Sequence, residues 1–309
     1  MSELSLDDFR GDVRRQRTEK IVHVLLWAAG FFSVVISALI IGSLIREAWT
    51  FITQVDWSTV IGPEAVGWFP RRGQYGIMTL IMGSIIVTVI AMVIAGPIGL
   101  ATAIYLSEYA SPRVRRILKP AIEILAGIPS VVVGFFALTF IAPQIIQNIW
   151  ALSPQQTMMA AGLGVGVMII PIIASISEDA MSSVPDALRE ASYGMGARKI
   201  TTVLKVVVPA SVSGLMAAFI IAISRAMGET MVVFIAAGKS GGALFETDPL
   251  QPGLTMTAGM ASLAAGTDSV VGEGLTFQSL FFVGIVLFTI TLTLNLFADR
   301  FVRRVRQKY

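Results

Sequence analysis

Six apolar segments, each long enough to cross a lipid bilayer as a helix, constrain the fold of this chain more than any other feature. They cover residues 21–45, 77–104, 117–141, 158–176, 207–237 and 277–298. Spanning the hydrocarbon core takes about 20 helical residues, and a spanning segment must be helical because no water there satisfies its backbone. The sequence therefore predicts an all-α integral membrane protein with six transmembrane helices.

The composition excludes several other classes of protein. Only 14% of the residues are charged, against roughly 25% in soluble domains. The sequence has no cysteine and one histidine, His23, which excludes disulfides, thiolate ligands and multi-histidine metal sites. Because no HExxH motif occurs, we expect neither catalytic nor metal-binding residues. The first apolar segment exceeds the roughly 7–15 residues of the apolar h-region in a cleavable signal sequence, so we expect a retained anchor.

The basic residues predict the orientation of the helices. Of the 23 lysine and arginine residues, 18 fall in the tails and in or beside the loops that join spans two to three and four to five. Four fall in the other loops, and Arg225 lies inside a span. By the positive-inside rule, both termini are therefore cytoplasmic. The basic residues are dispersed in small groups without aromatic stacking partners, so the pattern does not indicate nucleic-acid binding.

The loops on the outer side are long. The first contains Trp49, Trp57 and Trp68, which is typical of a segment at the membrane interface, and the last, at 238–276, is rich in glycine. Both are either solvated connections or a landing surface for an extracytoplasmic partner. The predicted layout is a cytoplasmic tail (1–20), a first helix with its outer interfacial loop (21–76), a transmembrane core (77–300) with a cytoplasmic loop (177–206), and a second tail (301–309).

The cytoplasmic loop has the pattern of two short helices. Ser183 and the acidic residue three positions later have capping-box spacing, which predicts a helix start. Gly194 and Gly196 are expected to end that helix, because glycine tolerates positive φ. A second helix is expected over about 197–205, and Pro209 begins the next span. The pair of helices is either a lever that a soluble protein grips or an amphipathic elbow on the membrane.

A spaced motif in this loop resembles a known family. Glu190, Ala191 and Ser192 are followed after three residues by Gly196, and after nine more by a segment that ends in Pro209. This spacing resembles the EAA loop of ABC-importer permeases, with Ser192 in place of the second alanine. The resemblance implies a type I ABC importer permease (MetI-like) core. It also implies that Glu190, Ala191, Gly196 and Pro209 belong to coupling helices that dock on a separate ATPase.

Other stretches narrow the resemblance. GLATAIYLSEYASPRVRR, LAGIPSVVVGFFAL, PIIASISEDAM and RAMGETM resemble the phosphate importer permeases of the PstC and PstA type, and the first span and C-terminal end are more similar to PstC. The resemblance implies an ATP-driven importer subunit that passes inorganic phosphate across the bacterial cytoplasmic (inner) membrane as half of a heterodimeric pore. The implied partners are a PstA-like second permease, two PstB-like ATPase subunits and an extracytoplasmic PstS-like phosphate-binding protein.

Motifs that the sequence lacks indicate where ATP binds and argue against other classes of transporter. The Gly-Lys-Ser run at 238–240 falls on the outer side, and Val233 stands where a Walker A motif needs glycine. ATP and magnesium are therefore expected on the partner ATPase, with no cofactor on this chain. An ion-coupled secondary transporter is one rival, but such proteins carry several intramembrane acids, and only Glu123 and Glu229 qualify here. A permease for sulfate, molybdate or tungstate is another.

Two opposite charges lie inside the fifth apolar segment. Arg225 and Glu229 are four residues apart, so a continuous helix places them on one face, roughly 5–6 Å apart at Cβ. One reading is an ion pair that fixes helix packing. The other is a substrate pathway, in which Arg225 binds phosphate oxygens and Glu229 competes so that binding stays weak. Ser130 in the third span is a further candidate, as a hydroxyl donor in that pathway or in helix packing.

Overall fold

The computed structural model describes residues 13–62, 65–238, 242–265 and 274–305. Residues 239–240 of the Gly-Lys-Ser run and parts of both predicted tails lie outside the described residues. The longer helices are α1 (Val13–Gln54), α2 (Ile77–Ile104), α3 (Pro112–Ala126), α6 (Met158–Ser182), α10 (Val212–Met227), α12 (Met256–Ala265) and α13 (Thr276–Val305). The shorter ones are α4 (Ser130–Phe136), α5 (Gln147–Ile149), α7 (Asp186–Gly194), α8 (Lys199–Thr202), α9 (Val208–Ala210) and α11 (Met231–Ala236).

Several α-helices are followed or preceded by short π-helical segments, and two 3₁₀ turns occur in the loop before α2. Three π-helical turns are η3 (Tyr105–Tyr109), η4 (Ala137–Ile146) and η5 (Val203–Val207), and two 3₁₀ turns are η1 (Trp57–Thr59) and η2 (Pro70–Arg72). The strands are β1 (Gly67–Phe69), β2 (Gln74–Tyr75) and β3 (Ala243–Leu244).

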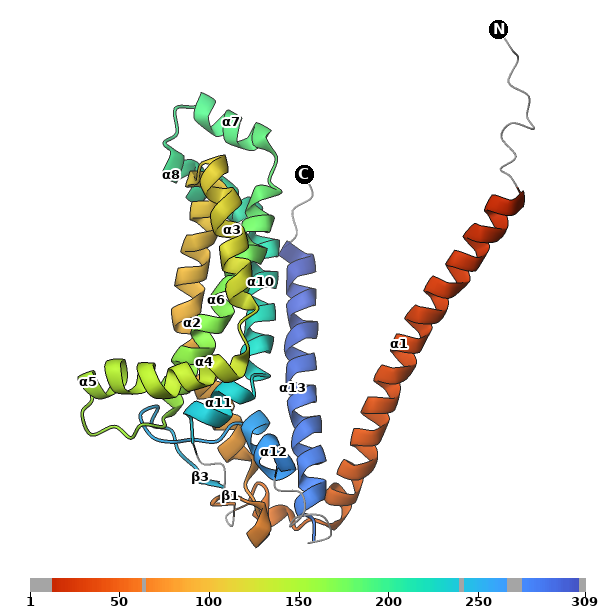
Figure 1. Ribbon diagram of the computed structural model, residues 1–309, viewed down its shortest axis with the longest axis vertical. Helices are drawn as coiled ribbons and strands as arrows, with labels where there is room; N and C mark the ends of the chain where they lie inside the picture. The colour runs from red at the N-terminus through yellow and green to blue at the C-terminus, as the bar shows by residue number, and fades with distance from the viewer. Residues whose placement is uncertain (1–12, 63–64, 239–241, 266–273, 306–309) are drawn as a thin grey trace.

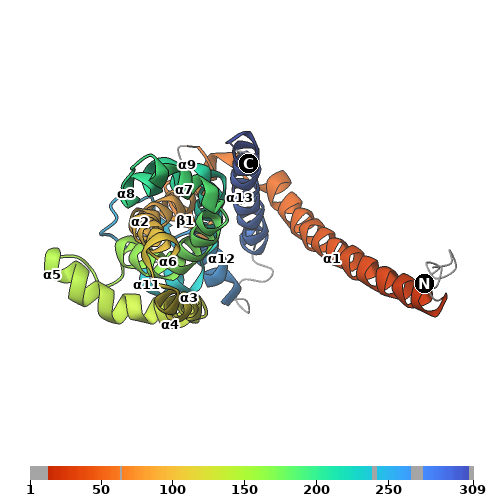
Figure 2. The ribbon, with the colours of Figure 1, turned by 90° about the horizontal axis from the view of Figure 1, so that it is seen from above.

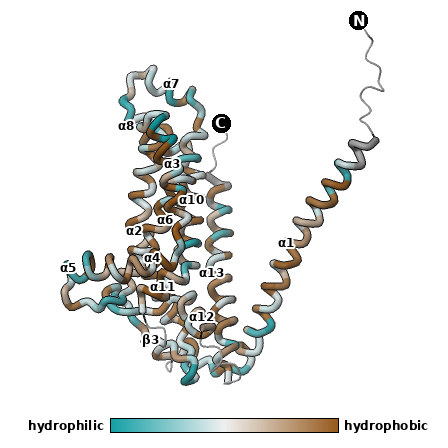
Figure 3. The backbone as a smooth tube through the Cα atoms, viewed as in Figure 1, coloured by the Kyte–Doolittle hydropathy of each residue, from teal (hydrophilic) through white to brown (hydrophobic). Residues whose placement is uncertain are grey.

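The helices confirm the predicted membrane architecture. Five are long and apolar enough to cross a membrane, and a sixth span results if the bent pair Lys199–Ala210 and Val212–Met227 counts as one. Helix α1 leans away from the others (Figures 1 and 2) and is apolar over much of its length (Figure 3). Its large apolar side chains are exposed, as those of a helix surrounded by lipid would be. The N-terminal end of α1, the C-terminal end of α13, and α7 all lie toward the same end of the molecule, the top of Figure 1.

The third predicted span, 117–141, is not one helix, so that prediction is wrong. Helix α3 ends at Ala126, and α4 begins at Ser130, directly after Pro129. Proline has no N–H to donate and disfavours the helical conformation at the residue before it, which explains the break. The apolar helix in this region runs over Ser130–Ile149 and projects sideways from the bundle, whereas α3 lies along it (Figures 1 and 2).

The fifth predicted span, 207–237, is broken twice. At Ser211 the chain bends by 72°. Further on, α10 ends at Met227 and α11 begins at Met231, with Gly228 as the C-cap of α10. One continuous helix through this segment is therefore wrong. Glycine lowers helix stability by about 1 kcal/mol relative to alanine, which favours a helix end at this position.

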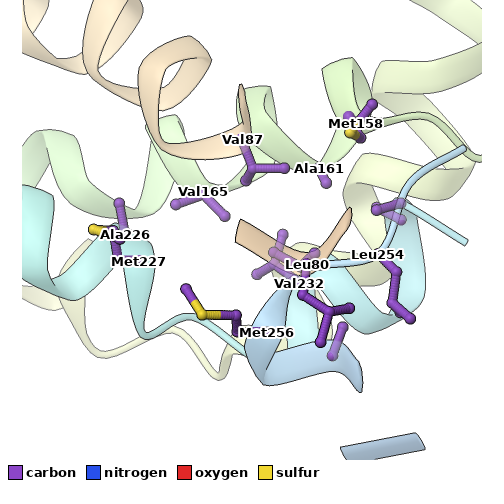
Figure 4. Close-up of a cluster of buried hydrophobic side chains, with 14 of the residues drawn as sticks. Leu80, Val87, Met158, Ala161, Val165, Ala226, Met227, Val232, Leu254 and Met256 are labelled. Carbon is purple, nitrogen blue, oxygen red and sulfur yellow. The ribbon is translucent and has the colours of Figure 1, made fainter. Parts of the chain in front are cut away.

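Helices α2 and α6 pack side by side through small residues. A Cβ atom added to Gly162 would lie 2.7 Å from the side chain of Ile90, and one added to Gly99 would lie 2.8 Å from that of Ile173. Glycine at these positions lets the two backbones approach closely. The order of the two contacts along the chain shows that α2 and α6 run parallel. Figure 4 shows part of the apolar core that α10, α11 and α12 build against this pair.

A small antiparallel sheet lies at the end of the bundle opposite α7 (Figure 1). Its strand order is β2-β1-β3. Trp68 of β1 is buried, and its ring meets that of Tyr75 edge-on, with the ring centroids 6.1 Å apart. Trp68 therefore belongs to the core of this sheet, and the place of its loop at the membrane interface stays a prediction. Trp49 and Trp57 are exposed.

Candidate functional site

Glu229 lies in the break between α10 and α11 and is held by the backbone of α11. Its side chain is 5% exposed, and Oε1 accepts the N–H of Met231 at 3.2 Å and that of Val232 at 3.4 Å. The first N–H groups of a helix lack intrahelical partners and carry partial positive charge, so a carboxylate stabilises them. The Thr257 hydroxyl of α12 donates to the Glu229 carbonyl oxygen at 2.7 Å. Glu229 is therefore fixed through both its side chain and its backbone.

Arg225, in the last turn of α10, is held much more loosely. Its Nη2 lies 3.9 Å from Glu229 Oε2, and its side chain is 56% exposed. The predicted pair therefore forms, although a helix break separates its two members. So long a contact to a half-exposed arginine contributes little to stability. The planar guanidinium thus keeps most of its donors available for another anion.

A second polar contact beside Arg225 was missed by sequence reasoning. The Ser224 hydroxyl donates to Asn295 Oδ1 of α13 at 2.8 Å, and Asn295 is exposed. Ile221 and Gly228 are exposed on one face of α10. Because successive residues of a helix are about 100° apart, Ser224 and Arg225 lie on either side of that face. Charged and polar side chains inside apolar spans avoid lipid, so this face suits a second subunit or a water-filled pathway. The sequence signal that could have indicated this contact was the single asparagine, Asn295, in the last apolar segment.

Ser130 is the first residue of α4, which packs against α11. One turn later, a Cβ added to Gly134 would lie 3.0 Å from Ile235 Cδ1 and 3.2 Å from the Met231 carbonyl oxygen. Glycine at position 134 therefore allows α4 and α11 to approach closely. Ser130 is half-buried on the same short helix, and its role in a substrate pathway stays a prediction.

The predicted coupling residues lie at the end of the bundle where α7 projects (Figure 1). Glu190 and Ala191 are exposed on α7. Gly196 follows with a φ of 78°, which confirms the expectation of a glycine in the left-handed region at the helix end. Pro209 is exposed in α9, just before the 72° bend. The motif residues are thus gathered at one end of the molecule, around a short helix with a free outer face.

The start of α7 differs from the prediction. The Ser183 hydroxyl donates to the Ala180 carbonyl oxygen at 2.8 Å, and the N-cap residue of α7 is Pro185, without a side-chain cap. The predicted capping box is therefore wrong, because Ser183 bonds back to the end of α6. Helices α7 and α8 are joined instead by a 2.8 Å hydrogen bond between the hydroxyls of Ser192 and Thr202.

Glu178 of α6 is a buried acid that sequence reasoning overlooked. Its carboxylate forms ion pairs with Arg115 and Lys119 of α3, the second at 2.6 Å, and accepts the Ser182 hydroxyl at 2.9 Å. Asp179 pairs with Lys119 at 2.5 Å. Glu178 lies near the end of the candidate span Met158–Ser182, so it is a further acid to consider beside Glu123 and Glu229. The two cations neutralise it, so the cluster fixes α3 on α6 and does not form a proton relay.

Together, these features define a class of protein. A bundle of bilayer-length apolar helices, with an arginine exposed among them and short helices projecting at one end, is that of a membrane transport subunit. Within the described ranges, no three His, Asp or Glu side chains gather to hold a metal ion. Residues 95–307 match the family "Binding-protein-dependent transport system inner membrane component". The chain belongs to this family and is a multi-pass membrane component of a transport system.

Three similar proteins extend the comparison. The probable ABC transporter permease protein YqgH of Bacillus subtilis is 38% identical over 190 residues, 62% of this chain and 58% of that protein, so less than two thirds of that relative is matched. The phosphate transport system permease protein PstC of Haemophilus influenzae is 31% identical over 293 residues, 88% of this chain and 89% of that protein. The PstC relative confirms the resemblance to phosphate importer permeases.

The third comparison concerns the fold. A chain from the crystal structure of a bacterial ABC transporter involved in the import of alginate aligns with a TM-score of 0.64 at 16% identity, over 94% of this chain and 100% of that chain. This alignment confirms the predicted importer-permease fold.

Proposed function

We propose that this chain is one permease subunit of an ATP-driven importer for inorganic phosphate in a bacterial inner membrane, with both termini cytoplasmic. A PstA-like second permease completes the pore, two PstB-like ATPases supply the energy, and a PstS-like binding protein delivers phosphate from outside. Membership of the transport family and the 31% identity to a PstC protein support this proposal. The chain itself carries no catalytic residue, and ATP with its magnesium binds to the partner ATPase.

The proposal rests on one observation: at the break between α10 and α11, Glu229 is held firmly and Arg225 is held loosely. Glu229 is fixed by α11, whereas Arg225 is half-exposed and only 3.9 Å from one carboxylate oxygen. A doubly charged oxyanion can displace so long a contact and take the guanidinium in a bidentate arrangement. Glu229 then limits the affinity, because it is a fixed negative charge beside the bound anion. Ser130 is a neutral donor candidate for the same pathway.

The exposed face around Arg225 also supports the proposal of a second permease. Arg225 and Asn295 lie open on the single chain, and lipid is an unfavourable environment for both. A second permease that faces this surface would enclose a polar pathway. We assign ATPase docking to the surface at the end of the bundle where α7 projects, which contains Glu190, Ala191 and Gly196. The bend after Pro209 joins this surface to α10.

The test measures phosphate uptake in bacteria that depend on this importer. Arg225→Gln should abolish uptake while the chain still inserts and its ATPase partner still co-purifies. Arg225→Lys should retain only part of the activity, because the charge persists but the planar fork is lost. Arg46→Gln is the matched control, since it removes the same charge from an exposed position on α1. Normal uptake by Arg225→Gln would refute the assignment.

The rival classes are separated by two further measurements. Reconstituted alone in liposomes with an ion gradient, a secondary transporter would move substrate, whereas this chain should not. In the complete complex, ATP hydrolysis should rise on addition of the binding protein loaded with phosphate. Stimulation by sulfate, molybdate or tungstate instead of phosphate would keep the importer and change its substrate. Absence of any co-purifying ATPase would contradict the importer itself.

A further inference from the structure

Arg189 of α7 is a largely buried cation at the point where three elements meet. Its Nη2 donates to Glu108 Oε1 at 2.9 Å and to the Met181 carbonyl oxygen at 2.9 Å, and its Nη1 donates to the Val184 carbonyl oxygen at 2.6 Å. Its Nε adds a longer bond to Glu108 Oε1 at 3.3 Å. Glu108 belongs to η3, the π-helical turn after α2, and the two carbonyls mark the end of α6. One guanidinium therefore joins α2, α6 and α7.

The surroundings of this guanidinium make the contact hard to break. Burial by itself lowers the pKa of Arg189, but the hydrogen bond and the charge of Glu108, together with smaller contributions from Asp186 and Tyr193, outweigh burial and raise the pKa above its ordinary value. The carbonyls at the end of α6 carry partial negative charge, so they attract the same cation. Separation would leave the buried Glu108 carboxylate without its cation, which is a large penalty. We therefore expect α7 and η3 to move as one unit.

The position of the contact in the chain gives it a specific consequence. Helix α6 leads into α7 through three residues, so its end follows α7 through the backbone. Glu108 lies 81 residues before Arg189, so α2 has no such short covalent connection to α7. Side chains make the connection instead. Lys199 of α8 adds a second contact to η3, with Nζ 4.8 Å from the centre of the Tyr109 ring.

We propose that Arg189 and Glu108 are positioning residues that make the end of α2 move together with α7 when a partner ATPase displaces α7. The inference rests on the proposed function, which makes α7 the element that docks on the ATPase. As α7 moves, Arg189 carries Glu108 and η3 with it, so α2 and α6 are displaced as a packed pair. Without the ion pair, part of each movement of α7 is lost at η3, and ATP is hydrolysed without a matching rearrangement of the spans.

The test compares transport with hydrolysis in the complete complex, purified through this chain and reconstituted in liposomes with phosphate as the probe. The quantity measured is ATP hydrolysed per phosphate imported. Glu108→Gln, which keeps the side-chain volume, should raise this ratio about tenfold, within the usual range of coupling energies. Arg189→Lys should raise it less, because the charge persists but the fork is lost. Asp186→Asn is the matched control, because Asp186 pairs with the same guanidinium at 3.1 Å but is 88% exposed.

The outcomes separate a positioning role from a structural one. A raised ratio in Glu108→Gln and Arg189→Lys, with a normal amount of bound ATPase and a wild-type ratio in Asp186→Asn, supports the proposal. An unchanged ratio in both variants overturns it, and so does a proportional loss of hydrolysis and import, because that indicates only fewer assembled complexes. If no ATPase accompanies the wild-type chain, the proposed function fails and takes this inference with it.

Discussion

The ion cluster between α3 and α6 allows a quantitative test, because two adjacent carboxylates meet the same cation in different environments. Glu178 is fully buried and holds Arg115, Lys119 and Ser182. Asp179 is 63% exposed and pairs with Lys119 alone at 2.5 Å. Glu178→Gln and Asp179→Asn each remove one negative charge and hardly change the volume. They therefore isolate the effect of burial.

The expected magnitudes follow from the contacts. Removing one partner of a buried ion pair costs about 3–5 kcal/mol when the other charge stays buried. Arg115 and Lys119 are partly exposed, so water hydrates them after the change, and we expect about 2–3 kcal/mol for Glu178→Gln. An exposed pair contributes about 0–1 kcal/mol, which sets the expectation for Asp179→Asn. The two variants should therefore differ in free energy of unfolding by about 2 kcal/mol.

The assay is thermal unfolding of the full-length chain in detergent, followed by circular dichroism at one fixed scan rate. At roughly 2–4 °C per kcal/mol for a chain of this size, Glu178→Gln should lower the midpoint by about 5 °C or more. Asp179→Asn should lower it by about 4 °C or less. Equal shifts, or a larger shift for Asp179→Asn, would refute the argument that the buried carboxylate fixes α3 on α6.

Two further predictions concern packing and pH. Gly162→Ala should lower the free energy of unfolding by about 1–3 kcal/mol through overpacking, because the added Cβ would lie 2.7 Å from Ile90. Gly30→Ala is the control: a Cβ there has nothing within 4 Å, so the unfolding midpoint should stay unchanged or rise slightly. Similar midpoints for the two variants would contradict the prediction. Burial raises the pKa of the Tyr75 phenol above 10.0, although a hydrogen bond with Thr276 lowers it in part. The neutral Tyr75 phenol therefore contributes its full stabilisation below pH 10, and this stabilisation is lost as pH rises through the folded-state pKa. The tyrosinate absorbance that Tyr75→Phe removes should appear above pH 10. Its appearance at lower pH would contradict the prediction.

The candidate site was predictable in its residues but not in its shape. The spacing of Arg225 and Glu229 indicated contact, and the structure confirms the pair at 3.9 Å. The same spacing suggested one continuous helix, because a single glycine inside an apolar run is a weak signal for a helix end. Once the helix ends at Gly228, Glu229 becomes the acceptor for the N–H groups of α11. That role distinguishes the fixed carboxylate from the loosely held guanidinium.

The contacts that join distant segments were not predictable from local patterns. Glu178 meets Arg115 across 63 residues, and Arg189 meets Glu108 across 81. In each case, the sequence shows one charge near the end of an apolar segment, where lipid headgroups and water are equally suitable partners. The side-by-side packing of α2, α3 and α6 determines which charges meet.

The sequence by itself determined the number and approximate place of the apolar spans, the glycine-terminated helix that precedes Gly196, and the presence of a charged pair inside the fifth span. These features depend on the chemistry of neighbouring residues, because bilayer-length hydrophobicity and glycine at positive φ act locally. Only the tertiary structure decided that the third and fifth spans are broken, that Glu229 is fixed while Arg225 is open, and that Arg189 connects α7 to α2. Each of these depends on which backbone and side-chain groups the folded chain brings within hydrogen-bonding distance, and the local pattern of residues does not specify that.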